Sequence, residues 1–265
     1  MNLLWGECTW EEIAQAAKED YLVVLPAGAI EQHGPMLPVD VDARLAERNA
    51  VEGAQYARDK YNLNVLVLPP LHYGQSCHHM NFSGTISLRF ETYIAALSDI
   101  MREVARYGFR TLVVQNGNGG NQTSIEVARH KLMEEFALAG RDVKIYVHPG
   151  HSDPYIREEH RKARESGLMK DEKQMAIHAS AYETSQMLAD RPHVVKTEKM
   201  VKPPLKRTTA PDFAWRTDEI SETGAFGDPS LATRELGVRL WDIWAEGIAR
   251  FLVKISEERG SGKKR

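Results

Sequence analysis

Short apolar segments alternate with longer, mostly helical segments along the chain. The apolar segments, rich in valine, leucine and isoleucine, occur at residues 21–25, 64–68, 111–114 and 143–147. The helices expected around them are 9–18, 42–60, 90–107, 123–138, 153–173 and a long final helix that carries Trp241, Trp244 and Ile255 on one stripe. Strands that alternate with helices favour a mainly parallel sheet. The sequence therefore predicts an α/β fold in which helices cover both faces of such a sheet.

The chain has 265 residues and shows no internal repeat or composition shift that would mark a second domain. We therefore expect one domain over residues 1–258, followed by a flexible basic tail at 259–265. The net charge of −3 gives no basic surplus for binding nucleic acid. No apolar run is long enough to cross a bilayer, and the N-terminus lacks a signal-peptide pattern. Two cysteines without a CxxC motif favour a reducing, cytoplasmic location.

The stretch from Leu25 to Asp42 leaves an apolar strand and carries three good metal ligands, Glu31, His33 and Asp42 itself. In an extended chain, residues i and i+2 point to the same side, so Glu31 and His33 can face one ion. Asp42 can be a further ligand or the N-cap of helix 42–60, and the two roles compete for the same oxygens. Carboxylate and imidazole ligands suit zinc, manganese or iron better than calcium. We interpret this stretch as the first half of a metal site.

Two later segments follow predicted strands and are rich in polar side chains. Segment 72–85 holds histidines at positions 72, 78 and 79. Because open α/β sheets place their sites at the carboxyl ends of strands, we expect a functional histidine among them, with purely structural histidines as the alternative. The turn 115–121, Gln-Asn-Gly-Asn-Gly-Gly-Asn, lacks a P-loop lysine and GxGxxG spacing. Its glycines instead favour close approach of the backbone to a small ligand or metal.

The second half of the chain carries fewer chemical signals. Segment 153–173 is strongly charged, and we interpret it as a solvated surface helix, with a mobile lid as the alternative. His178 and Glu183 lie five residues apart, so they reach one pocket only from the first turns of a helix. A position near a helix N-terminus, favoured by the helix dipole, is the structural explanation for Glu183.

These motifs together resemble, in the same order, those of the creatininase (creatinine amidohydrolase) family. The stretch from Leu25 to Asp42 is highly specific for that family, and segments 82–88, 116–121, 178–185 and 227–229 also match, so the resemblance spans nearly the whole chain. It implies a three-layer α/β/α sandwich with a divalent metal site at the carboxyl ends of the strands. It also implies a hydrolase of small, usually cyclic amides. Family members often assemble as homo-oligomers, in particular as hexamers built as a trimer of dimers.

The resemblance also assigns roles to individual residues. Glu31, His33 and Asp42 match metal ligands, and Asp42 would bridge the ions if two are bound. Glu183 matches a carboxylate that completes the metal site and takes part in catalysis, and His178 matches a catalytic or substrate-facing histidine. The implied cofactor is a divalent metal, with zinc first and manganese or iron as alternatives, in one or two sites. Substrate contacts are expected from His79, Ser83, Gly119, Gly120 and Asn121.

The chain departs from the family pattern at the glycine-rich turn. The family's turn usually reads Asn-Gly-His, and that histidine binds metal, whereas this chain has Asn118, a weak and neutral ligand. Three outcomes follow: fewer protein ligands, replacement by another histidine such as His79 or His151, or one empty position out of two. Gly120 stands where creatininase itself uses an acid. These changes argue against creatinine as the substrate.

The residues and the resemblance favour one function and leave alternatives. The leading hypothesis is hydrolysis of a small, cyclic carbonyl compound of the amide or lactam type by water activated at a divalent metal. A cyclic keto-sugar, keto-inositol or lactone from carbohydrate catabolism is the alternative substrate. The other classes are a non-catalytic metal- or ligand-binding protein with a degenerate site, and a metal-dependent sugar-phosphate isomerase, for which a clear phosphate clamp is missing.

Overall fold

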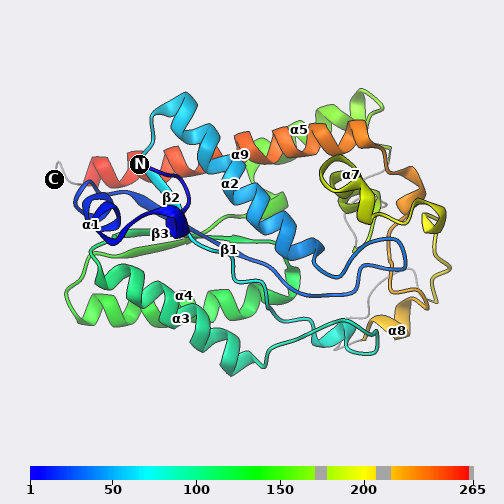
Figure 1. The fold of residues 1–265 in the computed structure, drawn as a ribbon, viewed down its shortest axis with the longest axis horizontal. Coiled ribbons are helices and arrows are strands. Elements are labelled where there is room, and N and C mark those ends of the chain that lie inside the picture. Colours follow the sequence, from blue (N-terminus) through cyan, green and yellow to red (C-terminus); the bar gives the residue numbers. More distant parts are fainter. Residues whose placement is uncertain (171–177, 207–215, 263–265) are drawn as a thin grey trace.

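The computed structural model describes residues 1–170, 178–206 and 216–262, with side chains up to residue 259 (Figure 1). Its strands are β1 (Leu22–Ala27), β2 (Val65–Val67), β3 (Thr111–Asn116) and β4 (Lys144–Val147). Its α-helices are α1 (Trp10–Lys18), α2 (Val41–Tyr61), α3 (Phe90–Arg106), α4 (Gln122–Leu138), α5 (Pro154–Glu165), α7 (Ala181–Asp190), α8 (Thr217–Ile220) and α9 (Arg234–Gly262). Three 3₁₀ turns border the site: η2 (Cys77–His79), η3 (Gly119–Asn121) and η4 (Gly150–Ser152).

The four described strands form one parallel sheet in the order β2-β1-β3-β4. β1 is central, because Leu22 pairs with Val65 of β2 on one side and with Thr111 of β3 on the other. All residues of β1 are buried, as expected for an interior strand of a parallel sheet that is covered on both faces. The prediction of a mainly parallel sheet is confirmed.

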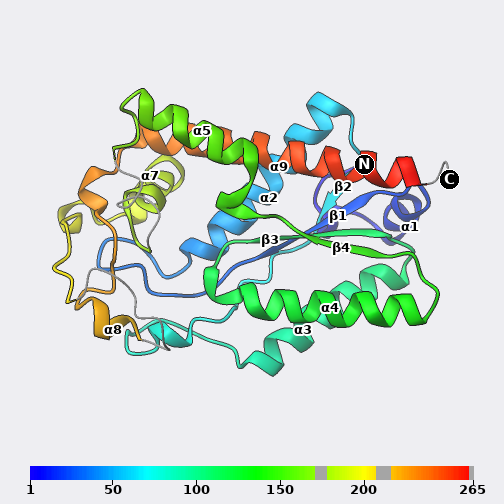
Figure 2. The same ribbon diagram turned by 180° about the vertical axis from the view of Figure 1, so that it is seen from behind.

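Helices cover both faces of this sheet (Figure 1 and Figure 2). On one face, α3 and α4 pack together, and Leu97 and Leu132 join Val23 of β1 in a hydrophobic core. On the other face, α2 and α9 pack together, and Ile248 of α9 lies in a second core with Val24 of β1. The three-layer α/β/α architecture is therefore confirmed.

The start of α2 differs from the sequence prediction. The helix begins at Val41, so the prediction that Asp42 is its N-cap is wrong. Asp40 occupies that position, and its carboxylate accepts two hydrogen bonds from Arg191 instead of capping the helix. Asp42 consequently lies in the first turn of α2, where it is buried and both of its oxygens are released from capping.

Helix α5 is shorter than the predicted segment 153–173. Asp153 is its N-cap, with an oxygen that accepts from the backbone N–H of Tyr155 and Ile156. The helix ends at Glu165 because Gly167, two residues later, has a φ of +78°, which ends a right-handed helix. Residues 171–173 of the predicted helix lie outside the described residues.

The final helix also has bounds that the sequence did not indicate. Trp241, Trp244 and Ile255 are buried along one stripe of α9, as predicted. The helix continues to Gly262, so residues 259–262, which were expected to start a flexible tail, are helical. Residues 263–265 lie outside the described part of the chain. Among the described residues, no helix is both long enough and apolar enough to cross a membrane.

Candidate metal centre

The candidate site lies where the carboxyl ends of β1 and β3 meet the first turns of two helices. The loop after β1 carries Glu31 and His33, the first turn of α2 carries Asp42, and the first turn of α7 carries Glu183. Gly117 follows β3, and a Cβ atom there would lie only 2.5 Å from the backbone oxygen of Asp42. Glycine at this position therefore lets the start of α2 lie directly against the glycine-rich turn.

His33 lies between two carboxylates. Its Nε2 is 3.2 Å from Oδ1 of Asp42 and 3.9 Å from Oε1 of Glu183. Its Nδ1 donates a hydrogen bond to the backbone oxygen of Glu31 (3.0 Å), so Nε2 of the neutral ring carries the lone pair. The other oxygen of Glu183 accepts a hydrogen bond from the backbone N–H of Ala179 (2.6 Å), which fixes the direction of the carboxylate. One nitrogen and two carboxylate oxygens thus face a common point.

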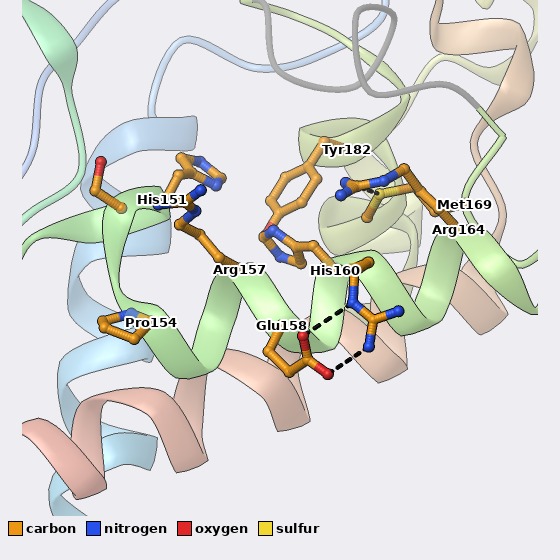
Figure 3. A pocket seen from close by; sticks show the side chains of 10 residues that line it. His151, Pro154, Arg157, Glu158, His160, Arg164, Met169 and Tyr182 are labelled. Atoms are coloured by element: carbon orange, nitrogen blue, oxygen red, sulfur yellow. Dashed lines mark hydrogen bonds and ion pairs between the residues drawn. The ribbon is translucent and has the colours of Figure 1, made fainter.

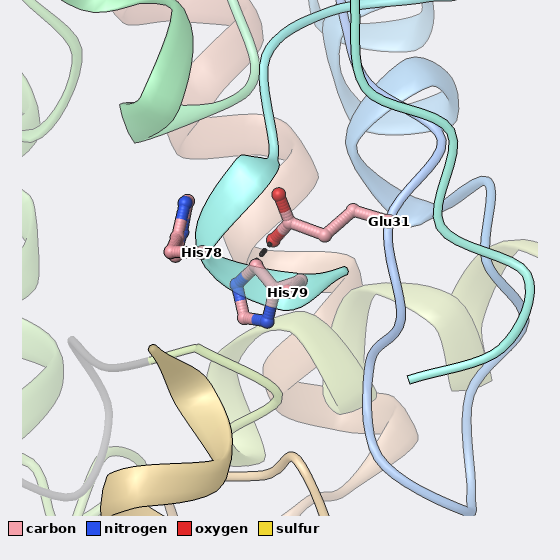
Figure 4. Close-up of side chains that lie close together, drawn as sticks. All are labelled: Glu31, His78 and His79. Atoms are coloured by element: carbon pink, nitrogen blue, oxygen red, sulfur yellow. Dashed lines mark ion pairs between the residues drawn. The ribbon is translucent and has the colours of Figure 1, made fainter. Parts of the chain in front are cut away.

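Three further imidazoles surround the carboxylate of Glu31. Its Oε1 is 3.1 Å from Nε2 of His79 and 3.2 Å from Nδ1 of His178. His78 and His79 both come from η2, and the ion pair of His79 with Glu31 is drawn in Figure 4. The possible ligand atoms form three overlapping groups, each with its atoms within 4.8 Å of one another: Glu31–His78–His79, Glu31–His33–His178 and His33–Asp42–Glu183.

Three buried atoms of these groups have no hydrogen-bond partner among the described residues. They are Oε2 of Glu31, Nε2 of His33 and Oδ2 of Asp42. Each unpaired buried polar group costs about 1–3 kcal/mol, and a charged one costs more. A divalent cation would remove that cost, and carboxylate and imidazole donors are ligands that zinc and manganese accept. The residues present therefore fit a divalent metal.

The charge balance of the cluster agrees with this interpretation. Burial raises the pKa of Asp42 to about 6 and the pKa of Glu183 to about 7, because the ionised carboxylates lose water. Burial acts to lower the pKa of His33, but the carboxylates of Asp42 and Glu183 outweigh it and raise that pKa to about 10. Burial lowers the pKa of His79 to about 3, which keeps this imidazole neutral. The metal-free cluster thus holds protons that a cation would displace.

We expect metal binding to raise the melting temperature more at pH 8 than at pH 5.5, because the ion must displace protons from Asp42, Glu183 and His33. Without metal, the carboxyl groups of Asp42 and Glu183 have pKa values of about 6 and 7, above the ordinary values of 3.8 and 4.5. The metal-free protein therefore loses stability as the pH rises from these ordinary values to the raised ones. The raised pKa of His33 likewise contributes stability below pH 6.5 that is lost as the pH rises through about 10. Scanning fluorimetry of chelator-treated protein, with and without Zn²⁺ or Mn²⁺, checks this; equal shifts at both pH values would contradict it.

Two residues that the sequence analysis did not single out hold the imidazoles in place. The amide nitrogen of Gln32 lies 2.7 Å from Nδ1 of His79, and the backbone oxygen of Gln32 lies 2.7 Å from Nε2 of His178. The hydroxyl of Thr217 lies 2.7 Å from the same Nδ1 of His79. Gln32 was adjacent to the predicted ligands but had no pattern of its own. Thr217 is 138 residues from His79, and no local sequence signal indicated the contact.

The side chain of Asn118 forms hydrogen bonds with the backbone and side chains of the neighbouring loops. Its Oδ1 accepts from the backbone N–H of Gly120 (2.9 Å), and its Nδ2 donates to the backbone oxygen of Gln75 (3.0 Å) and to the hydroxyl of Ser76 (3.2 Å). The structure therefore gives this residue a role in shaping the turn.

Of the two histidines considered as replacements at the metal site, the structure brings only His79 to the cluster. His79 lies 3.1 Å from Oε1 of Glu31. The ring of His151 packs instead on Tyr182 and Trp244, with centroid distances of 5.1 and 5.2 Å. His79, which we expected to contact substrate, is thus also placed as a possible ligand.

A large cleft with a volume of about 1330 Å³ opens beside the cluster. Three of the residues predicted to contact substrate, His79, Gly119 and Gly120, line it. Ser83 is exposed and is not among the described residues that line the cleft. Asn121 is fully buried, and its amide donates to a backbone oxygen after β1 (2.9 Å), which is a structural role. The glycine-rich turn therefore lines the cleft with Asn116 and Asn118 as well as with its glycines.

Comparison with known proteins identifies the family. Residues 6–252 match the family model Creatininase, described as creatinine amidohydrolase. The creatinine amidohydrolase of Pseudomonas putida is 31% identical to this chain over 256 residues, which cover 92% of this chain and 94% of that protein. The chain belongs to the creatininase family. The resemblance inferred from the motifs is thereby confirmed, and the chain is a metal-dependent hydrolase of the creatininase family.

Other proteins that are similar to this chain have names that refer to different substrates. The mycofactocin precursor peptide peptidase of Mycolicibacterium smegmatis is 29% identical over 231 residues, 86% of this chain and 83% of that protein. The 3-dehydro-scyllo-inosose hydrolase of Thermotoga maritima is 27% identical over 191 residues, 72% of this chain and 57% of that protein. A solved structure described as "Creatininase Mn" has a TM-score of 0.82 at 28% identity and covers 96% of this chain and 98% of its own. A mutant creatininase of "Zn-Zn type" has a TM-score of 0.80 with the same identity and coverage.

Proposed function

We propose that this enzyme hydrolyses an amide-type C–N bond in a small, cyclic carbonyl compound. The observation that carries the proposal is the convergence of unpaired buried atoms of Glu31, His33 and Asp42 beside a cleft of about 1330 Å³. A divalent ion held there supplies a Lewis acid that polarises a carbonyl oxygen and makes a water molecule more acidic. Zinc is the proposed ion, with manganese or iron as alternatives, because the carboxylate and imidazole ligands suit all three.

The residues of the site divide between binding the ion and moving a proton. Glu31, His33, Asp42 and Glu183 bind it in this proposal. Glu183 has one oxygen occupied by a backbone N–H, which favours binding the ion with the other oxygen over shuttling protons. His178 donates from Nε2 to the backbone oxygen of Gln32 (2.7 Å), so its Nδ1 carries the lone pair and faces the cluster. We assign to this Nδ1 the acceptance of a proton from the attacking water molecule and the transfer of that proton to the leaving nitrogen.

A cyclic keto-sugar, keto-inositol or lactone is the second candidate substrate. Side chains that can hydrogen-bond to hydroxyl groups line the cleft, among them Asn116, Gln122 and His148. Nδ1 of His148 accepts from the backbone N–H of Gly150 (3.2 Å), so its buried, unpartnered Nε2 carries the hydrogen and is a donor. The similarity to 3-dehydro-scyllo-inosose hydrolase supports the same candidate.

A screen with and without a chelator tests the proposed function. Purified protein is incubated with cyclic amides, lactams, linear peptides, lactones and keto-inositols, and products are followed by mass spectrometry. We expect hydrolysis of at least one cyclic amide, its loss after chelation, and its return with Zn²⁺ or Mn²⁺. Hydrolysis of only lactones or keto-inositols would favour the second candidate. Absence of bound transition metal after purification and a metal soak would favour a non-catalytic binding protein.

We also propose that the protein works in the cytoplasm as a homo-oligomer, a hexamer built as a trimer of dimers. Cys8 and Cys77 are free, which suits a reducing compartment. The oligomer rests on the family resemblance, and light scattering after size-exclusion chromatography measures it directly. A monomeric mass would contradict this part of the proposal.

A further inference from the structure

A second cavity adjoins the cleft, between α5 and the first turn of α7 (Figure 3). Its volume is about 640 Å³. His151, Ser152 and Tyr182 line both this cavity and the cleft. Tyr182 directly precedes Glu183 in α7, so the cavity begins one residue away from the candidate metal ligands. A molecule whose reacting group lies at the metal centre can therefore extend into the cavity.

The cavity carries an excess of positive charge. Arg161 is neutralised, because it pairs with Glu158 at 2.6 Å and also with Glu165. Glu158 is the one carboxylate among the described residues that line the cavity, and this ion pair occupies it. The side chain of Arg157 makes no ion pair or hydrogen bond with any described residue, and Arg164 adds a second guanidinium group. Arg157 thus remains without a carboxylate partner among the described residues.

An uncharged residue of the cavity also presents a hydrogen-bond donor. The indole N–H of Trp244 donates to the hydroxyl of Tyr182 (2.7 Å), so this hydroxyl donates its own hydrogen to Nε2 of His160 (2.9 Å). Burial lowers the pKa of His160 to about 4, so the ring is neutral and its remaining hydrogen lies on Nδ1. In Figure 3, Arg157 and Arg164 lie on opposite sides of His160. The groups that can still bind a ligand are therefore mostly donors.

We propose that this cavity binds an anionic group, a carboxylate or a phosphate, of the substrate that reacts at the metal centre. The proposal rests on the proposed hydrolase function and narrows its substrate to a molecule with a negative charge to one side of the scissile bond. A guanidinium group forms two parallel N–H bonds with either oxyanion. Arg157 is the main contact, because its side chain has no ion-pair or hydrogen-bond partner among the described residues, and Nδ1 of His160 adds a further donor.

Calorimetric titration of inorganic phosphate and of succinate into the metal-loaded protein tests the proposal. We expect one of the two anions to bind, and which one binds tells phosphate from carboxylate. Arg157→Gln should weaken that binding about 10- to 100-fold, as expected for a lost charged hydrogen bond. Arg161→Gln is the matched control, because it removes an arginine of the same cavity that is already neutralised, and it should change the affinity by less than about twofold. Arg157 is exposed, so its replacement leaves the fold intact.

The Asp42→Asn variant separates the two sites. If the anion binds in the cavity, this variant still binds it, whether or not hydrolysis is found. Unchanged affinity in Arg157→Gln, or binding that is lost only in Asp42→Asn, would overturn the proposal and place the anion at the metal centre. Absence of binding by both anions to the unmodified protein would overturn it as well. Failure of the hydrolase proposal alone would instead appear as anion binding without turnover of any amide.

Discussion

Replacement of Asp42 by asparagine is expected to remove metal binding and to lower hydrolysis by about 10³-fold or more. Oδ1 of Asp42 faces Nε2 of His33 at 3.2 Å, and its Oδ2 is buried without a partner. An amide in this position is neutral and presents an NH₂ group where a cation would lie. A bound ion supplies several kcal/mol of transition-state stabilisation, and each ~1.4 kcal/mol is tenfold in rate. Metal analysis by mass spectrometry and the rate on a substrate from the screen measure the two effects.

Asp40→Asn is the matched control for this variant. It makes the same chemical change two residues earlier, at a carboxylate that pairs with Arg191 outside the cluster. A partly exposed ion pair contributes about 0–1 kcal/mol, so we expect normal metal content and a normal rate. Full metal content and rate in Asp42→Asn would show that the ligands have been assigned wrongly.

The Gly237→Ala variant is expected to lose about 1–3 kcal/mol of stability, the usual cost of overpacking a close contact. A Cβ atom at position 237 of α9 would overlap the backbone oxygen of Ser185 in α7. Relief of this overlap must move α7 away from α9, and α7 carries Glu183 two residues before Ser185. For a chain of this size, each kcal/mol lowers the melting temperature by about 2–4 °C. Thermal and urea denaturation measure the loss, and metal affinity should fall with it.

Val238→Ala controls for the change in α9 itself. Val238 is 43% exposed on the same turn, so its truncation removes little buried surface. We expect its midpoint of denaturation to stay close to that of the unmodified protein. If Gly237→Ala also kept that midpoint, the close packing of α7 on α9 would not be a constraint on the site.

The fold and part of the site could be predicted because the signals were local. The apolar segment that became β1 is short, continuous and buried on both faces, and such a pattern indicates a strand of a parallel sheet. Glu31 and His33 follow that strand directly, and the structure brings them together with Asp42 and Glu183 as the family resemblance implied. Their role as metal ligands stays a prediction.

The supporting contacts could not be predicted because they join segments that are distant in sequence. Gln32 and Thr217 reach His79 from the loop after β1 and from α8, and neither residue type shows a period or motif that indicates such a contact. Asn118 was considered as a weak ligand from its position in a motif. Its use within the turn depends on the approach of Gln75, which only the packing of the loops decides.

One face of α5 is buried, although the charged composition of its sequence does not indicate this. Segment 153–173 is so rich in charge that a solvated helix was the natural interpretation, and the outer face of α5 is indeed charged. Ile156 and His160 are nevertheless buried on the other face. His160 contacts Tyr182 of α7 there, which is how α5 comes to form a wall of the cavity beside the cleft. The sequence alone gave no partner for that face.

Anomalous diffraction from crystals grown with Mn²⁺ or Zn²⁺ tests the metal centre most directly. The expected result is one or two peaks within about 2.0–2.2 Å of Nε2 of His33 and of carboxylate oxygens of Asp42 and Glu31, the usual bond lengths for these ligands. Glu183 should complete the coordination through the oxygen that does not bind the N–H of Ala179. A crystal that holds metal elsewhere, or none in this cluster at a saturating concentration, would contradict the assignment.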